Sequence, residues 1–107
     1  LDPTKPDYWY ALGRTRVLLG DKSGAKKAYK RELELCEADA KKDVKDIGAQ
    51  LSQVRPLVLL NRADDARKLI EKTARANPTN AELKQLIDRK ELDALLADPK
   101  IQEAMVK

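Results

Sequence analysis

Carboxylates occur in close pairs, such as Asp64-Asp65 and Glu32-Glu34. Paired carboxylates are among the side chains that general acid–base catalysis uses. Both pairs, however, stand on or just before expected surface helices and have Lys and Arg as neighbours. Solvated ion pairs are the ordinary outcome in such a setting. We therefore interpret these carboxylates as ion-pairing surface residues.

The other residues that carry enzyme chemistry are missing or isolated. The chain has no histidine, which excludes Ser-His-Asp and Cys-His systems and most zinc centres. Its four glycines are scattered and form no phosphate-binding loop. The single cysteine, Cys36, allows no internal disulfide and leaves the compartment open; we expect it to be buried as a small apolar side chain. The sequence predicts that the protein is not an enzyme and holds no cofactor or metal.

Basic residues gather in two clusters, but each is interspersed with or followed by acids, and the formal net charge is only +4. The clusters are Lys26, Lys27, Lys30 and Arg31, and Lys41, Lys42 and Lys45. The neighbouring acids weaken attraction to phosphates, and aromatic residues for base stacking make up only 4% of the chain. The longest uncharged apolar run, residues 56–60, is too short to cross a bilayer. We expect no nucleic-acid partner and no membrane insertion in this segment.

The composition favours an all-α chain. Its 107 residues suit one domain, Phe is absent, and the dominant residue types are those of amphipathic helices. Apolar spacing predicts a first helix over 7–19, with Trp9, Leu12, Arg16 and Leu19 on its inner face. A second helix should begin at Ser23 as N-cap and continue to about residue 40, with Ala25, Ala28, Tyr29, Leu33 and Cys36 inward.

The second half of the chain should also be helical. We expect a third helix over about 42–60, kinked at Pro56, with Val44, Ile47, Leu51, Val54 and Val58 inward. A corner at Asn61-Arg62 precedes a fourth helix over 64–76, whose inner face is Ala66, Leu69, Ile70 and Thr73. Residues 77–80 break the pattern, and helix then resumes to the C-terminus with an interruption at Asp98-Pro99.

Two segments align at a shift of 41 residues, Gly20 to Tyr29 with Asn61 to Ile70. In each, a turn is followed by a small residue, Ala25 or Ala66, and four residues later by a large one, Tyr29 or Ile70. A small side chain allows two helices to cross closely, and the large one fills the space a turn further on.

These residues resemble the tetratricopeptide repeat. The family motif has a Trp followed by Leu-Gly, a Gly-Asp corner, a small residue, an aromatic and a closing Pro, and the matching residues are Trp9, Leu12-Gly13, Gly20-Asp21, Ala25, Tyr29 and, in the second copy, Pro78. Arg16 replaces an aromatic, and Glu37 replaces the first closing Pro. With the 41-residue spacing, these departures imply lengthened helices similar to those of kinesin light chains.

The resemblance covers about residues 1–90 and implies antiparallel helix pairs stacked as a right-handed solenoid. The expected units of this single domain, 1–107, are a repeat at 6–40, a repeat at 42–78 with a lengthened first helix, and capping helices at 79–107. Residues 1–3 resemble the end of a preceding repeat, so the sequence is expected to begin inside a longer protein. Residues 92–102 are similar to a segment that closes bacterial repeat arrays.

In this family the first helix of each pair lines a concave groove, which implies a protein or peptide partner. The corresponding residues are Tyr10, Arg14, Val17 and Leu18 in the first copy and Leu51, Arg55, Val58 and Leu59 in the second. Arg14 and Arg55 share a repeat position and should lie side by side, where they suit an acidic segment; the alternative is that each pairs with an Asp or Glu of its own chain. The family's chaperone clamp uses Lys and Asn where Tyr10 and Arg14 stand, so chaperone binding is not expected.

The predicted function is that of a protein–protein interaction scaffold. The alternative is an oligomerisation or regulatory segment of a larger multidomain protein, including a homodimer formed through apolar faces at the ends of the stack.

Overall fold

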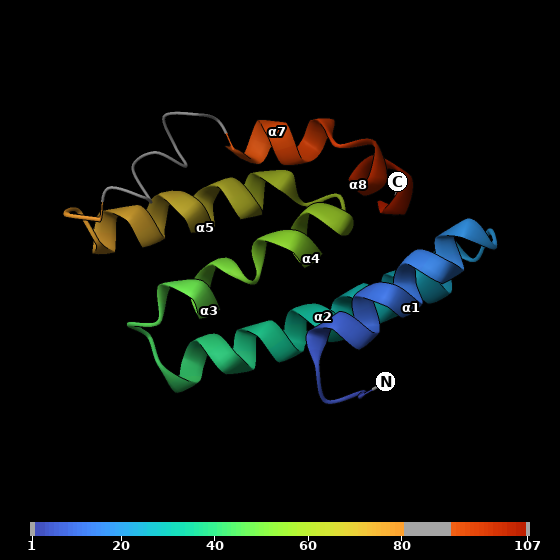
Figure 1. Ribbon diagram of the computed structural model, residues 1–107, viewed down its shortest axis with the longest axis horizontal. Coiled ribbons are helices and arrows are strands. Elements are labelled where there is room, and N and C mark those ends of the chain that lie inside the picture. Colours follow the sequence, from blue (N-terminus) through green and yellow to red (C-terminus); the bar gives the residue numbers. More distant parts are fainter. Residues whose placement is uncertain (1, 81–90, 107) are drawn as a thin grey trace.

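The structure, a computed structural model, describes residues 2–80 and 91–106, and these residues form helices and no strand. The helices are α1 (Pro6–Leu18), α2 (Lys22–Lys42), α3 (Ile47–Leu51), α4 (Val54–Leu59), α5 (Ala63–Ala76), α7 (Glu91–Ala97) and α8 (Pro99–Ala104). The predicted all-α fold is therefore confirmed. Helices α1 and α2 run antiparallel, and α4 and α5 form a second antiparallel pair (Figure 1).

The corner between α1 and α2 is built by Gly20 and Asp21. Gly20 has a φ of +82°, a left-handed conformation that glycine adopts without a side-chain clash. Asp21 is the N-cap of α2, because its Oδ1 accepts a hydrogen bond from the Gly24 amide at 2.9 Å. The prediction that Ser23 caps this helix is wrong, since α2 already begins at Lys22. Leu19, predicted to point inward, lies at this corner and is 79% exposed.

The inner face of α2 agrees with the predicted one. Its apolar members are buried, and they are Ala25, Ala28, Tyr29, Leu33 and Cys36. The Tyr29 ring lies directly against the backbone of Gly13 on α1, where a Cβ atom would lie only 2.7 Å from Tyr29 Cδ1. The Leu12-Gly13 pair of the repeat-like motif therefore allows α1 and α2 to pack closely around this ring.

The region predicted as one long third helix is divided into α3 and α4. Helix α2 continues to Lys42, and Val44, predicted to point inward, is 77% exposed in the following turn. Pro56 stands in the first turn of α4, where it has no amide hydrogen to donate to the Ser52 carbonyl. The helix is interrupted at residues 52–53, one turn before the expected kink, because the Ser52 carbonyl has no amide donor at position 56 to continue the helical hydrogen bonds.

Helix α5 confirms the predicted fourth helix, with Ala66 and Thr73 buried and Leu69 and Ile70 half-buried. Asn61 makes the preceding corner with a φ of +61°. The expected helix over 81–90 lies outside the described residues. Asp98 caps α8 through Lys100 N, and Pro99 is the first residue of that helix, so the predicted interruption is confirmed.

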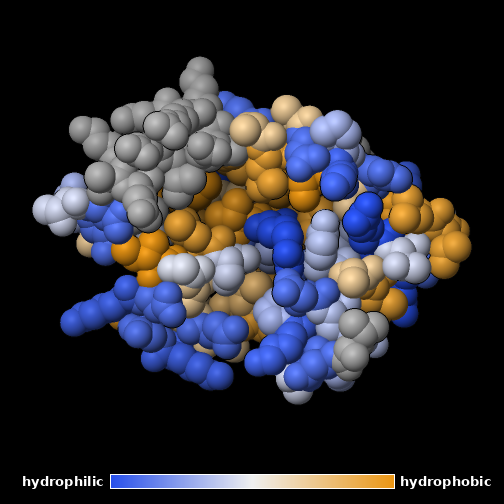
Figure 2. Space-filling model, viewed as in Figure 1, coloured by the Kyte–Doolittle hydropathy of each residue, from blue (hydrophilic) through white to orange (hydrophobic). Residues whose placement is uncertain are grey.

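The core joins both helix pairs to the C-terminal segment. Its buried members come from α2, α4, α5, α7 and α8, and they include Tyr29, Leu57, Leu59, Ala66 and Ile101. The principal-axis extents of the molecule are 44 × 30 × 19 Å, so the helices form a flat arrangement. Figure 2 shows hydrophobic residues across the middle of one face, above a polar lower edge.

Candidate functional site

The face assigned to a groove by the sequence is partly covered by the C-terminal segment of the same chain. Helix α8 packs on α1 and α4. The hydroxyl of buried Tyr29 donates to the Ala104 carbonyl at 2.6 Å, and the Val106 amide donates to the Leu59 carbonyl at 2.8 Å. Two direct hydrogen bonds thus fix residues 104–106 against the two helix pairs.

Several of the predicted groove residues belong to this packed interior. Val58 and Leu59 are fully buried, and Tyr10 and Val17 pack against the same core. In this structure these four residues are part of the core or pack against it, and Leu59 also holds the C-terminal segment through its carbonyl.

Arg55 is engaged inside the protein. Its Nε donates to Glu32 Oε2 at 2.8 Å, and its Nη2 donates to Asp7 Oδ1 at 2.7 Å. The guanidinium also lies 4.2 Å from the centre of the Tyr10 ring, within the range of a cation–π interaction. Arg55 therefore links α4 to both helices of the first pair. This agrees with the alternative expectation from the sequence, in which the arginine pairs with an Asp or Glu of its own chain.

Glu32 is the buried centre of this network. Its side chain is 0% exposed, and its Oε1 has no hydrogen-bond partner among the described residues. Burial raises the pKa of Glu32 to about 6, against the opposing effect of Arg55. A carboxylate in this position depends on Arg55 for compensation of its charge.

The remaining predicted residues are spread over the surface. Leu18 is 58% exposed at the end of α1, and Arg14 is half-buried and forms no ion pair within the described residues.

Leu51 and Arg55 line a hollow of about 450 Å³, together with Asp7, Cys36 and Ser52. Lys5 and Asp39 give this hollow charges of both signs.

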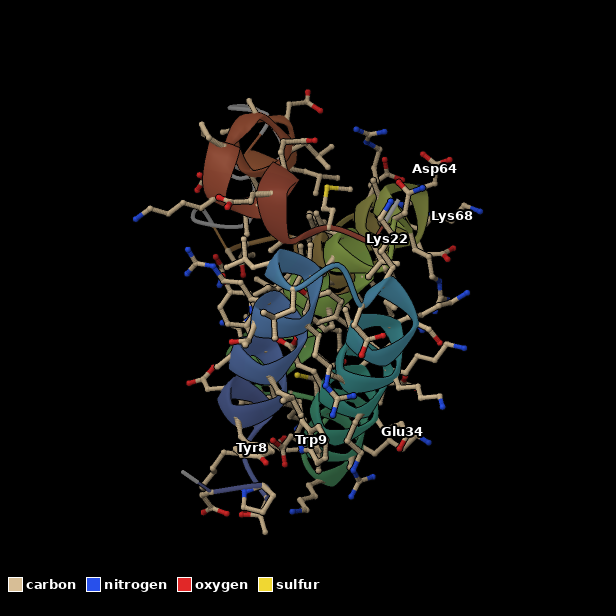
Figure 3. All side chains as sticks on the ribbon, turned by 90° about the vertical axis from the view of Figure 1, so that its right-hand side faces the viewer. Tyr8, Trp9, Lys22, Glu34, Asp64 and Lys68 are labelled. Carbon is tan, nitrogen blue, oxygen red and sulfur yellow. The ribbon has the colours of Figure 1, made fainter. Side chains whose placement is uncertain are left out.

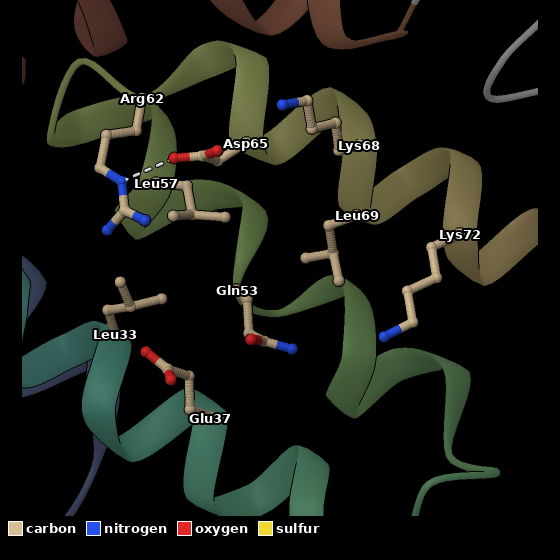
Figure 4. A pocket seen from close by; sticks show the side chains of 9 residues that line it. All are labelled: Leu33, Glu37, Gln53, Leu57, Arg62, Asp65, Lys68, Leu69 and Lys72. Atoms are coloured by element: carbon tan, nitrogen blue, oxygen red, sulfur yellow. Dashed lines mark hydrogen bonds and ion pairs between the residues drawn. The ribbon is translucent and has the colours of Figure 1, made fainter.

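An open groove lies elsewhere, between α2, α4 and α5 (Figure 4). It encloses about 340 Å³ and has a leucine from each helix, Leu33, Leu57 and Leu69. We call it the leucine groove; its other lining residues are Glu37, Gln53, Arg62, Asp65, Lys68 and Lys72. A neighbouring hollow shares Arg62, Asp65 and Lys68, so the depression continues around the α4–α5 corner.

The leucine groove lies on the side of the molecule that α1 does not cover. In Figure 3, Lys68 of α5 and Glu34 of α2 both project on the side away from α1. The sequence placed the binding surface on the first helix of each pair, whereas this groove is bordered by the second helices, α2 and α5, together with α4.

The charged residues on the rim of the leucine groove differ in sign and in whether they form ion pairs. Arg62 and Asp65 pair with each other at one end, with Arg62 Nε 2.9 Å from Asp65 Oδ2. Lys68 and Lys72, both exposed on α5, form no ion pair within residues 2–80 and 91–106, and neither does Glu37 on α2. An apolar floor between unpaired charges of opposite sign is suited to recognising a protein segment.

Sequence reasoning placed Leu33 and Leu69 in the core but did not identify the groove. A signal was present, because Lys68, Leu69 and Lys72 put two cations one helical turn apart beside an apolar residue. What periodicity could not supply was the distance between α2 and α5, which depends on the division of the intervening segment into α3 and α4.

Other chemistry has little support among the described residues. Cys36 is buried as predicted, and burial raises the pKa of its thiol, which disfavours the reactive thiolate. Over the same residues, no group of three His, Cys, Asp or Glu side chains is placed to hold a metal ion. None of the helices described is long and apolar enough to span a membrane.

No protein-family model matches this chain, and no curated protein or solved structure matches it either.

Proposed function

We propose that this chain is a protein-interaction module that binds a segment of a partner protein in the leucine groove. The observation that carries the proposal is the convergence of three leucines, one from each of three helices, on one depression, where Leu33 and Leu57 form a buried floor and Leu69 is half-buried. Apolar depressions with a polar rim are where partner side chains gain most binding energy, because their contact surface is removed from water there.

The repeat-like packing supports the same function. Ala25 and Ala66 are both fully buried at corresponding positions of the two antiparallel pairs, α1–α2 and α4–α5. A stack of tetratricopeptide-like pairs would explain this correspondence, and we include that arrangement in the proposal. Such stacks present extended surfaces that bind other proteins.

The choice of the leucine groove over the face of α1 and α4 follows from accessibility. Val58 and Leu59 on that other face are buried, and Arg55 is paired with Glu32 and Asp7. A partner there would have to displace residues 104–106 and break their hydrogen bonds. Leu33 and Leu57 of the leucine groove are also buried, but Leu69 is half-buried, and within residues 2–80 and 91–106 no segment is bound across that groove as residues 104–106 are on the other face.

Selection from a displayed library of random peptides tests the proposal. The selected peptides should shift the backbone NMR signals of α2, α4 and α5 around the groove. Leu69→Glu, which places a carboxylate beside the leucines, should abolish binding. The matched control is Leu18→Glu at the exposed end of α1, which should bind as the wild type does. Circular dichroism would establish that both variants remain folded.

A second pair of variants guards against unfolding, because Leu69 is half-buried. Lys68→Glu and Lys72→Glu alter exposed rim residues and should change peptide affinity without loss of helix. If no peptide is enriched, or if enriched peptides bind the Leu69→Glu protein with wild-type affinity, the proposed function is wrong.

Self-association is the second candidate, and the exposure of adjacent leucines favours it. Leu18 and Leu19 are 58% and 79% exposed at the corner between α1 and α2. Exposed apolar residues that adjoin each other can pair between two copies of a chain. Sedimentation equilibrium should then give a dimer that Leu18→Glu/Leu19→Glu converts to monomer; a monomeric wild type would exclude this function.

A further inference from the structure

The two long sides of the leucine groove carry opposite charges that form no ion pair among the described residues. Lys68 and Lys72 stand on the α5 side, one turn apart, and Glu37 stands on the α2 side. Leu33 stands beside Glu37 on α2, Leu69 stands with the lysines on α5, and Leu57 comes from α4 (Figure 4). The two sides of the groove therefore present different electrostatic environments to anything that binds between them.

The charges at the end of the groove do not remove this difference. Arg62 and Asp65 neutralise each other through their ion pair and stand where α4 turns into α5. Gln53, in the middle, is uncharged, and its side-chain amide donates to the Gln50 carbonyl at 3.1 Å. Of the described residues that line the groove, the two lysines and Glu37 thus remain as the charges that a bound segment would meet.

The spacing of the lysines indicates the shape of the partner. Residues four apart on a helix have Cβ atoms about 5–6 Å apart, and a parallel or antiparallel helix offers carboxylates at the same spacing. A depression between two helices also suits the common mode in which an amphipathic helix places its apolar face in a groove.

From this geometry we infer that the partner segment is an amphipathic helix with a different charge on each flank of its apolar stripe. Carboxylates on one flank pair with Lys68 and Lys72, and a cation on the other flank pairs with Glu37. This inference rests on the proposed function, since it names the chemistry of the segment that the leucine groove binds.

The two charged flanks also determine the direction of the bound helix. Turning a helix end for end in the groove exchanges its flanks, which would place carboxylates against Glu37 and the cation against the lysines. Unlike charges attract and like charges repel at this range, so one direction is preferred.

Three fluorescein-labelled helical peptides of about 16 residues, or roughly four turns, provide the test. All share one symmetric leucine stripe. The first has Glu on one flank and Lys on the other, the second has Glu on both, and the third has Lys on both. Fluorescence anisotropy should show the first peptide binding about tenfold more tightly than the third, with the second between them, at low salt.

A charge-reversed protein tests the direction. In Lys68→Glu/Lys72→Glu/Glu37→Lys the two sides of the groove are exchanged, so the first peptide should bind with nearly unchanged affinity but end for end. A spin label at the peptide N-terminus should broaden signals near residue 62 in one protein and near residue 72 in the other.

The outcomes separate the two proposals. If the three peptides bind equally, or the label broadens the same end in both proteins, the charge inference fails and the groove remains a binding site. If none binds, the proposed function fails with it. A dimer by sedimentation that competes with the peptides would assign the groove to a second copy of the chain and overturn the inference.

Discussion

Arg55 of α4 donates through its Nε to the fully buried carboxylate of Glu32 on α2, at a distance of 2.8 Å. The same guanidinium reaches Asp7 of α1 at 2.7 Å, so one side chain joins both helices of the first pair to the second pair. Because Oε1 of Glu32 has no hydrogen-bond partner in the described part of the chain, little else there compensates the buried charge. The folding of this region therefore depends on Arg55 and on the protonation of Glu32.

Removing the arginine should destabilise the protein strongly. Arg55→Met leaves a buried carboxylate unpaired, and the expected loss is about 3 kcal/mol in the free energy of unfolding near neutral pH. Urea titration followed by circular dichroism measures it. The control is Arg31→Met, which breaks an exposed pair with Glu34 and should change stability by less than about 0.5 kcal/mol.

A double variant separates the charge effect from lost packing. Glu32→Leu/Arg55→Met removes both charges and should recover most of the stability lost in Arg55→Met, because no unpaired charge stays buried. If the double variant were as unstable as the single one, packing of the arginine stem rather than the ion pair would explain the loss.

The raised pKa of Glu32 predicts a stability that depends on pH. The folded state holds this proton up to about pH 6, whereas the ordinary pKa is 4.5. The folded state is therefore favoured fully below the ordinary pKa, and that contribution is lost as the pH rises through about 6. A shift of this size corresponds to about 2 kcal/mol.

Glu32→Gln isolates the contribution of Glu32 ionisation to the free energy of unfolding, because glutamine cannot ionise but can still accept a hydrogen bond from Arg55. The difference in unfolding free energy between wild type and variant should move by about 2 kcal/mol in favour of the variant between about pH 4 and pH 7.5. The measurement is urea unfolding at several pH values. A difference that stays constant across this range would show that Glu32 has an ordinary pKa.

The hydroxyl of Tyr29 fixes the C-terminal segment, and its removal should loosen that segment. Tyr29→Phe leaves the Ala104 carbonyl without its 2.6 Å donor in a buried place, with an expected loss of about 1–2 kcal/mol. Hydrogen exchange at the Met105 and Val106 amides should accelerate. Tyr8→Phe is the control, since within the described residues the Tyr8 hydroxyl makes no hydrogen bond and should be dispensable.

Much of the local structure followed from the sequence. The spacing of Ala25, Tyr29 and Cys36 predicted the buried face of α2, and Pro99 predicted the start of α8. These features depend on neighbours within a few turns, which periodicity and capping chemistry describe well. The division at residues 52–53 was missed because the effect of Pro56 falls on a carbonyl four residues earlier.

The candidate site was less predictable, because it depends on contacts between distant segments. Nothing near Arg55 in the sequence indicates that it pairs with Glu32, 23 residues away. Likewise, the repeat resemblance implied an open face on α1 and α4, whereas Tyr29 and Leu59 bind residues 104–106 there. The lysines of the leucine groove become meaningful only once α2 and α5 are seen on its two sides.

The close approach of Gly13 to Tyr29 gives the most direct test of the packing between α1 and α2. A Cβ atom at position 13 would lie 2.7 Å from Cδ1 and 2.9 Å from Cζ of the Tyr29 ring. Both distances are shorter than those at which non-bonded carbon atoms approach each other. The ring is fully buried and held by its bond to Ala104, so it cannot turn away without breaking that bond. Gly13→Ala should therefore destabilise the protein by about 2–3 kcal/mol despite the better helix propensity of alanine.

Gly48→Ala is the matched control, because Gly48 is also helical but its new Cβ would meet only Asp46 Oδ1, at 3.4 Å. Helix propensity then dominates, and the variant should be up to about 1 kcal/mol more stable than the wild type. Thermal and urea unfolding of the two variants should thus change in opposite directions. Equal stabilisation of both would mean that α1 and α2 are further apart than the Gly13–Tyr29 contact requires, and that the first helix pair is not packed around Tyr29.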